Sequence, residues 1–558
     1  MIRTIFIRSV MTMCMILLMT PCTNAESYEE EILKGTVFPL RHAISRGLEK
    51  NLDLKGVQLN IPMSRENAAV YDSAFDPLFT TSIGSLEQKD PTASPFSSED
   101  FSLYRETRGG LGISKAFHFG LKSSLSFETN RSENNSSIDA LRPQYRNYFI
   151  LNITQPLLRD FGIKINTTNV RISTNQIRQA SYDYIYHAQG LTEKIEISYY
   201  DLTQALRILQ YRIKSRELAR TLLSGNQKKF ESGIVPITEV QEAETAVASR
   251  EEQVISATQH VEIASNYLKD LLEIKDEDQL YKTPILAEPL TSIEHVFPNM
   301  DTALSLALEK RPDLKSQRME ILNRDIHIAY YKNQKLPRID LEATLGLNGL
   351  SGKIRPVSFS GIPVTTSYEG DYADAFSNMA RGEGYEWFVG VLFSYPLGNR
   401  SAKAQYQLSE QKKLQALYKL KRLERKAETE VKNAIIIINR SIERARVAEQ
   451  FQNLAQTTLD QEMKRLQKGL SDTFRILNFQ EKQIESCIRK VIALVDFNKG
   501  LATLYRAMGS NLERFDILVI SQVEIGNALF FKNSRSDEYD LLFVGHLDNP
   551  TSFKKQVN

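Results

Sequence analysis

The chain has 558 residues, of which 42% are hydrophobic and 25% charged, and its 70 basic residues nearly balance 68 acidic ones. This balance excludes the strongly basic surface on which most nucleic-acid-binding proteins depend. Three cysteines leave little scope for a disulfide framework.

The N-terminus reads as a secretory signal. Arg3 and Arg8 precede an apolar run from Val10 to Met19, and small residues end the segment at Ala25. We therefore expect residues 1–25 to be a signal peptide and the mature chain to begin at Glu26. No later segment holds the roughly 18 to 20 uninterrupted apolar residues of a membrane helix, so any passage through a membrane must use strands.

Cys22 offers an alternative, a lipid-modified N-terminal cysteine, but Met19, Thr20 and Pro21 before it lack the small residue usual there. Ordinary cleavage removes Cys14 and Cys22 and leaves only Cys487, which excludes an intrachain disulfide. The mature chain would then carry equal numbers of basic and acidic residues, since Arg3 and Arg8 leave with the signal.

The mature chain repeats itself. Residues 43–55 (AISRGLEKNLDLK) and 303–315 (ALSLALEKRPDLK) share seven identities at a constant offset of 260. Later landmarks recur at smaller offsets, such as Gly233 with Gly469. The sequence thus predicts two copies of one unit, over residues 26–290 and 291–520, with a tail at 521–558 to which it assigns no role.

Each copy contains a long helical pattern. Residues 163–231 hold no proline, and apolar residues recur at steps of three and four from Leu191 to Ile213. One helix of that length would measure about 104 Å. The second copy runs over 400–468, with Ala427, Val431, Ala434 and Ile438 in similar register.

A short turn follows each long helix. Gly233 and Gly469 suit the left-handed backbone that ends a helix, with Pro236 in the first turn. Thr238 or Asp472 can cap the returning helix. That helix reaches about Glu273 in one copy and Met508 in the other, so each copy is predicted to form a long antiparallel helical hairpin.

In other segments, apolar residues recur at every second position, as in a β-strand. Residues alternate in polarity from Trp387 to Tyr395 and over 341–347, and more weakly over 149–153. Nine residues suit a tilted membrane strand, and Trp387 and Tyr395 would mark the two aromatic girdles. A half-buried strand of a soluble sheet is the alternative.

The copies differ in length between their corresponding prolines. Pro77 and Pro156 enclose about 20 residues more than Pro337 and Pro396, and residues 107–129 read as the additional hairpin, turning near His118 to Gly120. Whether this hairpin adds strands to a membrane barrel is left open. The stretches 90–104, 130–144 and 350–384 are predicted to be surface loops.

No catalytic or cofactor-binding motif is complete in the sequence. Gly352 and Lys353 lack the neighbours of a phosphate-binding loop, the seven histidines show no metal-ligand spacing, and no serine elbow occurs. We expect no enzymatic activity, no metal and no cofactor.

The signal, duplication, helical hairpins and strand pairs together resemble the TolC-type outer-membrane efflux family over about residues 38–515. Residues 74–78 (AFDPL), residues 154–162 (TQPLLRDFG) and the turns at Gly233 and Gly469 carry the resemblance. It implies a membrane β-barrel joined to a long α-helical barrel, built by a homotrimer as one tunnel from the periplasm through the outer-membrane lipid. Such ducts dock on a periplasmic adaptor and an inner-membrane pump, and they pass drugs, metal ions or proteins outward.

The resemblance also places a periplasmic gate at the hairpin turns. Thr238 and Glu239 match a pair that closes the tunnel in the best-known members, whereas their usual partners are replaced by Leu466 and Ser471. The acidic residues that narrow the entrance there fall on Arg475 and Asn478.

This substitution suggests that three copies of Arg475 make the entrance less cation-selective, unless Arg475 pairs with Asp472 or Glu239. Two other functions stay open: a periplasmic structural coiled coil without a channel, and the same duct dedicated to type I protein secretion.

Overall fold

A computed structural model describes residues 35–93, 99–275, 297–359 and 366–519, together with Ile32, Asp278 and residues 285–286, 362–363 and 544–546. The chain divides into two compact units. Unit 1 comprises residues 1–60, 180–316 and 420–558, and unit 2 comprises 61–179 and 317–419. The predicted signal peptide and nearly all of the predicted tail lie outside the described residues.

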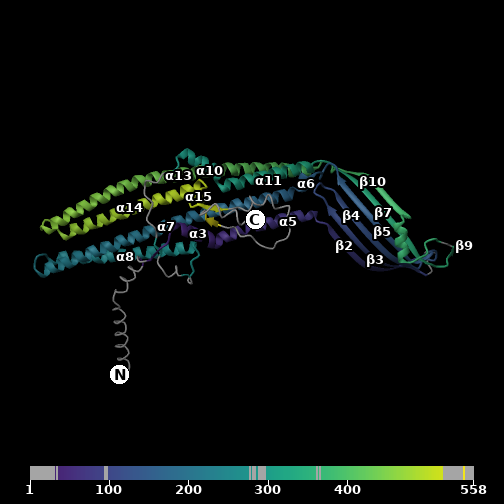
Figure 1. Ribbon diagram of the computed structural model, residues 1–558, viewed down its shortest axis with the longest axis horizontal. Helices are drawn as coiled ribbons and strands as arrows, with labels where there is room; N and C mark the ends of the chain where they lie inside the picture. Colours follow the sequence, from purple (N-terminus) through teal and green to yellow (C-terminus); the bar gives the residue numbers. More distant parts are fainter. Residues whose placement is uncertain are drawn as a thin grey trace, which may run out of the picture. The chain divides into compact units, whose positions relative to one another are not determined.

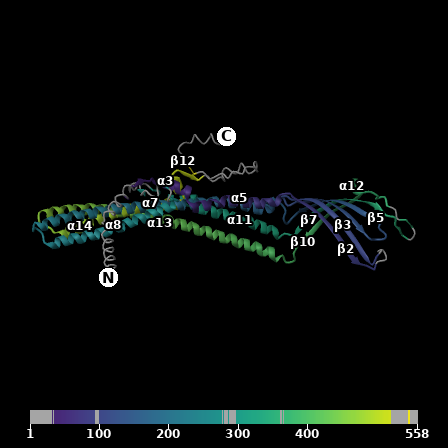
Figure 2. The ribbon, with the colours of Figure 1, turned by 90° about the horizontal axis from the view of Figure 1, so that it is seen from below.

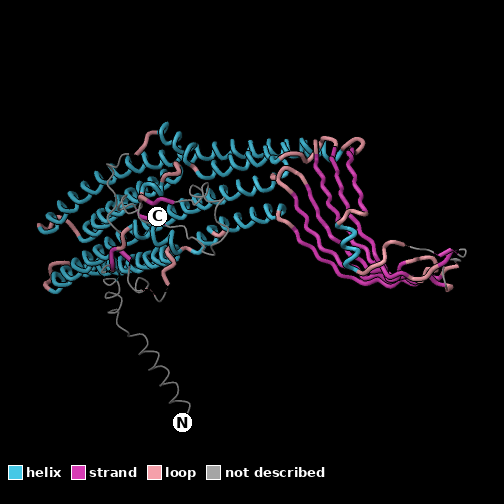
Figure 3. Tube along the Cα trace, turned by 45° about the vertical axis from the view of Figure 1, so that its right-hand side comes forward, coloured by secondary structure: helices cyan, strands magenta, loops and turns pink. Residues whose placement is uncertain are grey.

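Unit 2 contains a six-stranded antiparallel sheet in the order β10-β7-β5-β4-β3-β2 (Figure 1). Figure 3 shows the strands side by side in magenta. Their bounds are β2 Leu78–Pro91, β3 Phe101–Ala116, β4 Lys122–Asn134, β5 Leu141–Pro156, β7 Arg338–Ile354 and β10 Gly384–Ser394. The predicted strands at 149–153 and 341–347 are thus parts of β5 and β7, and the one at 387–395 is part of β10 except for Tyr395, which follows it.

The additional hairpin forms and joins the sheet. β3 pairs with β4 from Tyr104↔Asn134 to Ala116↔Lys122, and the turn between them contains Gly120 at φ +103°. Residues 107–129 therefore belong to two strands of this sheet, which lie between β2 and β5.

The three predicted loops were partly wrong, because strands extend into each of them. β3 begins at Phe101, β4 continues to Asn134 and β7 to Ile354. The third also contains helix α12, Tyr372–Ala380, which a capping box between Asp371 and Asp374 begins. α12 packs on β5 and β7. Polar composition suggested loops there, but cross-strand hydrogen bonds extend these strands beyond their apolar parts.

Unit 2 also contains the short antiparallel strands β8 (Ser358–Phe359) and β9 (Ile362–Pro363), and its other elements are helical. They are most of α5 (Asn60–Asp72), the 3-10 turn Ser73–Phe75, α6 (Ile163–Asn166) and most of α11 (Pro312–Gln334). The helix predicted over 163–231 is interrupted at Thr167, so α6 and α7 (Thr168–Glu231) are separate helices. The Thr167 hydroxyl donates to the carbonyl of Ile163 at 2.7 Å there.

Unit 1 is helical. Its main elements are α3 (Leu40–Lys50), α4 (Leu52–Gln58), α8 (Ile237–Leu271), α10 (Met300–Lys310), α14 (Thr473–Ala507) and α15 (Asn511–Arg514). Helices α7 and α13 (Arg400–Gln467) contribute residues to both units. Two strand pairs complete it, β1 (Thr36–Val37) with β6 (Ile285–Leu286) and β11 (Ile517–Val519) with β12 (Val544–His546).

The predicted apolar stripes form the core of unit 1. Along α7, Ile195, Leu202 and Leu209 are fully buried, whereas Ile213 at the end of the stripe is half-buried. The four predicted positions of α13 are also buried, and three of them pack in one cluster with Ala303 of α10 and Phe497 of α14. Spacing of three and four residues therefore identified the buried helix faces correctly.

Two pairs of helices at matching places in the predicted copies have equal lengths, whereas α7 has 64 residues and α13 has 68. α3 and α10 each have 11 residues, and α8 and α14 each have 35. Among the described residues, no helix combines the length and the apolar character needed to cross a membrane.

Candidate functional site

The two hairpin turns have the same backbone geometry. Gly233 and Gly469 adopt φ +68° and +74°, the left-handed region that favours glycine. The backbone amide of Ile234 donates to the carbonyl of Lys229 at 2.8 Å, and the amide of Leu470 donates to the carbonyl of Arg465 at 2.9 Å. Each bond reaches back five residues, which is the Schellman ending of a helix.

The returning helices begin differently. Asp472 caps α14 and accepts from the amide of Arg475 at 2.8 Å, as predicted. Thr238 was wrongly predicted as a cap of α8, because the N-cap is Pro236 and no side chain makes a capping hydrogen bond there. Proline fixes an extended backbone at this point, so Thr238 falls inside the first helical turn, where it is exposed.

Glu239 connects the two turns, which lie side by side at one end of unit 1 (Figures 1 and 2). Its carboxylate accepts from the amide of Thr473 at 3.0 Å. The buried Asn226 amide donates to the Glu239 carbonyl at 3.1 Å and to the Thr473 hydroxyl at 2.7 Å. We call Asn226, Glu239 and Thr473 the hairpin link; the sequence pointed to Glu239 and missed the other two.

The other predicted gate residues lie near the link without joining it. Ser471 donates to Glu462 at 2.6 Å within its own hairpin, and Leu466 is half-buried. Arg475 lies 3.6 Å from Asp472, and both side chains are about half exposed. Asn478 is exposed. The alternative in which Arg475 pairs with Asp472 is therefore the one observed.

A second connection between the hairpins was not predicted. Arg250 of α8 is 4% exposed. It donates to the Gln480 side chain at 2.9 Å and to the carbonyls of Ser215 and Leu477 at 2.9 and 3.2 Å. Burial lowers the pKa of Arg250. An isolated arginine in a helical repeat gives no sequence signal for such a role, because its partners lie on other helices.

The turns expose apolar side chains to solvent. Phe230, Ile234 and Ile237 of the first turn are 43–72% exposed, and Leu470 and Phe474 of the second are 64% and 63% exposed. Clustered apolar side chains at an exposed tip are typical of a surface that binds another protein.

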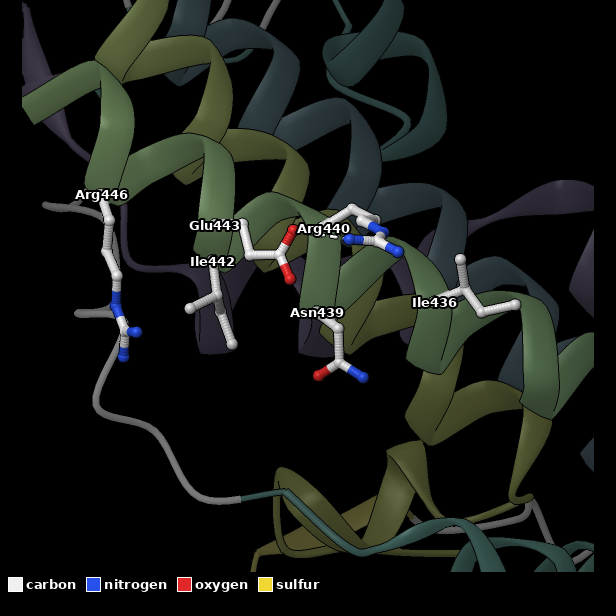
Figure 4. A pocket seen from close by; sticks show the side chains of 6 residues that line it. All are labelled: Ile436, Asn439, Arg440, Ile442, Glu443 and Arg446. Atoms are coloured by element: carbon white, nitrogen blue, oxygen red, sulfur yellow. Dashed lines mark hydrogen bonds and ion pairs between the residues drawn. The ribbon is translucent and has the colours of Figure 1, made fainter. Parts of the chain in front are cut away.

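One face of α13 also exposes apolar side chains to solvent. Figure 4 shows a shallow hollow on this helix, where the residues drawn project from one side. Arg440 and Glu443 form an ion pair there at 2.7 Å. Ile436, Val447 and Leu454 continue the face at 56–68% exposure. Their spacing of 11 and 7 residues places them on one stripe, as in a helix that packs against a partner helix.

The sheet of unit 2 has one apolar face and one polar face. Directly paired residues of antiparallel strands share a face. One row across all six strands is entirely apolar: Phe79, Ile113, Leu125, Leu151, Leu345 and Trp387. The row between it and the next apolar row is mostly polar or glycine: Thr80, Gly112, Ser126, Ile150, Gly346 and Glu386. We call the whole the two-faced sheet.

Much of the apolar face is exposed to solvent. Trp387 is 69% exposed, and Val389, Val391 and Phe393 beyond it are 62–65% exposed. Tyr395 directly follows β10 and is 38% exposed. On the same face α12 contacts the sheet, with the rings of Phe127 and Phe376 6.1 Å apart. An uncovered apolar sheet of this extent requires an apolar surrounding or a partner.

No group of acidic, histidine or cysteine side chains within the described part of the chain could hold a metal ion.

A family of known proteins matches most of this architecture. The outer membrane efflux protein family matches residues 113–272 and 303–510, which is more than half of the chain. No curated protein matches the chain in sequence.

Solved structures show the same fold. The outer-membrane channel OprN is 15% identical, with 85% of this chain and 90% of that chain covered and a TM-score of 0.61. CmeC of Campylobacter jejuni is 15% identical, with 84% and 85% covered and a TM-score of 0.59. VceC of Vibrio cholerae is 15% identical, with 84% and 96% covered and a TM-score of 0.59.

The chain therefore belongs to the outer membrane efflux protein family, whose members are located in the outer membrane and extend into the periplasm, and this is where the chain is located.

Proposed function

We propose that three copies of the chain form one export duct of a tripartite system. Each copy would contribute its two-faced sheet to a shared β-barrel in the outer membrane and its two hairpins to a shared α-helical tunnel in the periplasm. A periplasmic adaptor and an inner-membrane pump would deliver the substrate, which is a small molecule such as a drug, a metal ion, or a protein. Residues 26–290 and 291–520 would be two copies of one ancestral unit.

The observation that carries this proposal is the two-faced sheet. Its apolar rows suit lipid and its polar face suits water, as in the wall of a transmembrane barrel. Trp387 lies on the apolar face, and Tyr395, eight residues further on, directly follows the same strand; the two would mark the aromatic girdles. A soluble sheet would bury this face, yet Trp387 is 69% exposed.

The exposed face of α13 is evidence for contacts between subunits. Its stripe of Ile436, Val447 and Leu454 has the spacing at which helices pack in bundles. A second copy of the chain would cover it, and the neighbouring Arg440 and Glu443 would lie at the rim.

The hairpin turns would form the gate of the tunnel. The hairpin link ties α8 to α14 within one chain, so breaking it would let the two hairpins separate and open the tip. Thr238, Leu466, Ser471, Arg475 and Asn478 would line the entrance beside it. The exposed apolar residues Ile234 and Phe474 would contact the adaptor.

Native mass spectrometry of the chain extracted from outer-membrane fractions tests the proposal. A trimer that forms conducting pores in planar lipid bilayers is expected, with subunits that begin at Glu26. A monomer recovered only from the soluble periplasm would contradict the duct and favour a structural coiled coil.

A further inference from the structure

We propose that the shared barrel has eighteen strands, six from each chain, and that the hairpin β3–β4 widens its lumen. This inference rests on the proposed trimer. The two edges of the sheet are the interaction surface, and a second copy of the same chain binds there.

The first observation is the position of the hairpin within the sheet. β3 pairs with β2 over 14 residue pairs and β4 pairs with β5 over 11. The hairpin is therefore not an extracellular loop folded over a four-stranded sheet. It separates β2 from β5, which would otherwise be the neighbouring strands of the first copy, as β7 and β10 are of the second.

The second observation is the polarity of the hairpin. Leu111, Ile113, Leu125 and Phe127 continue the apolar rows of β5, with Leu125 opposite Leu151 and Phe127 opposite Phe149. The alternate positions carry small or polar residues: Gly110, Gly112, Ser114, Ser124, Ser126 and Glu128. A hairpin that lay in water on both sides would not need this alternation, whereas a strand between lipid and an aqueous lumen does.

The third observation is that the sheet ends in two edges. β2 and β10 stand at opposite ends of the strand order, and among the described strands neither has a second neighbour. Their apolar side chains are exposed, with Ile83 at 90% and Val391 at 64%. Open strand edges are not tolerated in lipid, and six strands are fewer than the eight of the smallest transmembrane barrels. β2 of one copy therefore pairs with β10 of the next.

Closure by three copies fixes the strand number and hence the width. With strands about 4.8 Å apart and tilted by about 40°, eighteen strands give a backbone diameter of about 36 Å, and twelve strands would give about 24 Å. Barrels of 16 to 18 strands enclose an aqueous channel. The outer-membrane end of this duct would therefore admit bulky substrates, including polypeptides, and leave size selection to the hairpin turns.

Electron cryomicroscopy of the detergent-extracted protein gives the direct test. A trimer with eighteen strands is expected. A trimer whose barrel has twelve strands, with residues 101–134 outside the wall, would overturn this inference and leave the proposed duct intact. The absence of a trimer would overturn both.

Accessibility from the cell exterior gives a second test. In a Cys487→Ser background, Asn152→Cys places a thiol on the polar face and Leu151→Cys places one on the apolar face. The reagents are maleimides attached to polyethylene glycols of increasing mass. The largest reagent that labels Asn152→Cys should be larger in the full-length chain than in a variant that also lacks residues 101–134. Equal size limits would contradict a widened lumen. Leu151→Cys is the matched control and should resist these hydrophilic reagents.

Discussion

The carboxylate of Glu239 accepts a hydrogen bond from the backbone amide of Thr473 at 3.0 Å, across 234 residues of sequence. It joins the first turn of α8 to the first turn of α14, so the two hairpins are held together where each returns. A negatively charged acceptor at a helix N-terminus is also favoured by the helix dipole. Substitutions at this contact therefore test the proposed gate directly.

Glu239→Ala should loosen the tip. Hydrogen bonds to charged groups contribute about 1.5–3 kcal/mol, so the opening equilibrium of each chain should shift about tenfold or more. Single-channel recording should show a higher mean conductance, and cells should admit large antibiotics that the closed duct excludes. Glu244→Ala, an exposed carboxylate on the same helix, is the control. If both variants conduct like the parent, Glu239 does not hold the tip closed.

The pair of Arg475 and Asp472 should set the ion preference of the entrance. Their charges nearly cancel at 3.6 Å, so Arg475→Gln should leave three unpaired Asp472 carboxylates and shift the reversal potential toward cation selectivity. Asp472→Asn keeps a capping side chain and should shift it in the opposite direction, while Arg475→Asp should give the largest shift toward cations. Unchanged reversal potentials in all three variants would place these side chains away from the ion path.

Glu196 should make unit 1 less stable as the pH rises. Burial raises the pKa of this carboxyl to about 7, more than the nearby Arg514 lowers it. Between about 4.5 and 7 the folded chain holds a proton that the unfolded chain has released, so stability falls across this range by on the order of 3 kcal/mol. Apparent melting temperatures at pH 5 and pH 8 measure the difference.

Glu196→Gln should reduce that difference between pH 5 and pH 8, because an amide does not titrate. A smaller difference should remain, since burial also raises the pKa of Glu193. Glu252→Gln, an exposed carboxylate of α8, should leave the pH dependence unchanged. A Glu196→Gln variant with the full pH dependence of the parent would exclude Glu196 as its source.

Arg250→Met should destabilise the contact between the hairpins. The substitution leaves the carbonyls of Ser215 and Leu477 and the side chain of Gln480 without their donor. Each unsatisfied buried group costs about 1–3 kcal/mol, which the apolar methionine offsets only in part. The apparent melting temperature should fall by several degrees. The matched control is Arg207→Met at an exposed position of α7, and an equal effect of the two would argue against the buried connection.

Most of the local structure could be predicted from the sequence. The period of three and four residues from Leu191 to Leu209 identified the buried stripe of α7, and the period of two from Trp387 to Phe393 identified β10. Gly233 and Gly469 marked two turns with one geometry. Two of the incorrect details, a continuous helix through Thr167 and a cap at Thr238, concern helix ends, where neighbouring positions compete closely. The three predicted loops were partly wrong because strands continue into them.

By itself the sequence determined which segments are helices or strands and which of their faces are apolar, because these properties depend on residues a few positions apart. Only the tertiary structure decided which segments meet. It placed β3 and β4 inside the sheet, Leu151 opposite Leu345, and Glu239 beside Thr473. The last two contacts join residues 194 and 234 positions apart, and many pairings would satisfy the same local pattern. The observed one is selected by burial and hydrogen bonding over the whole chain.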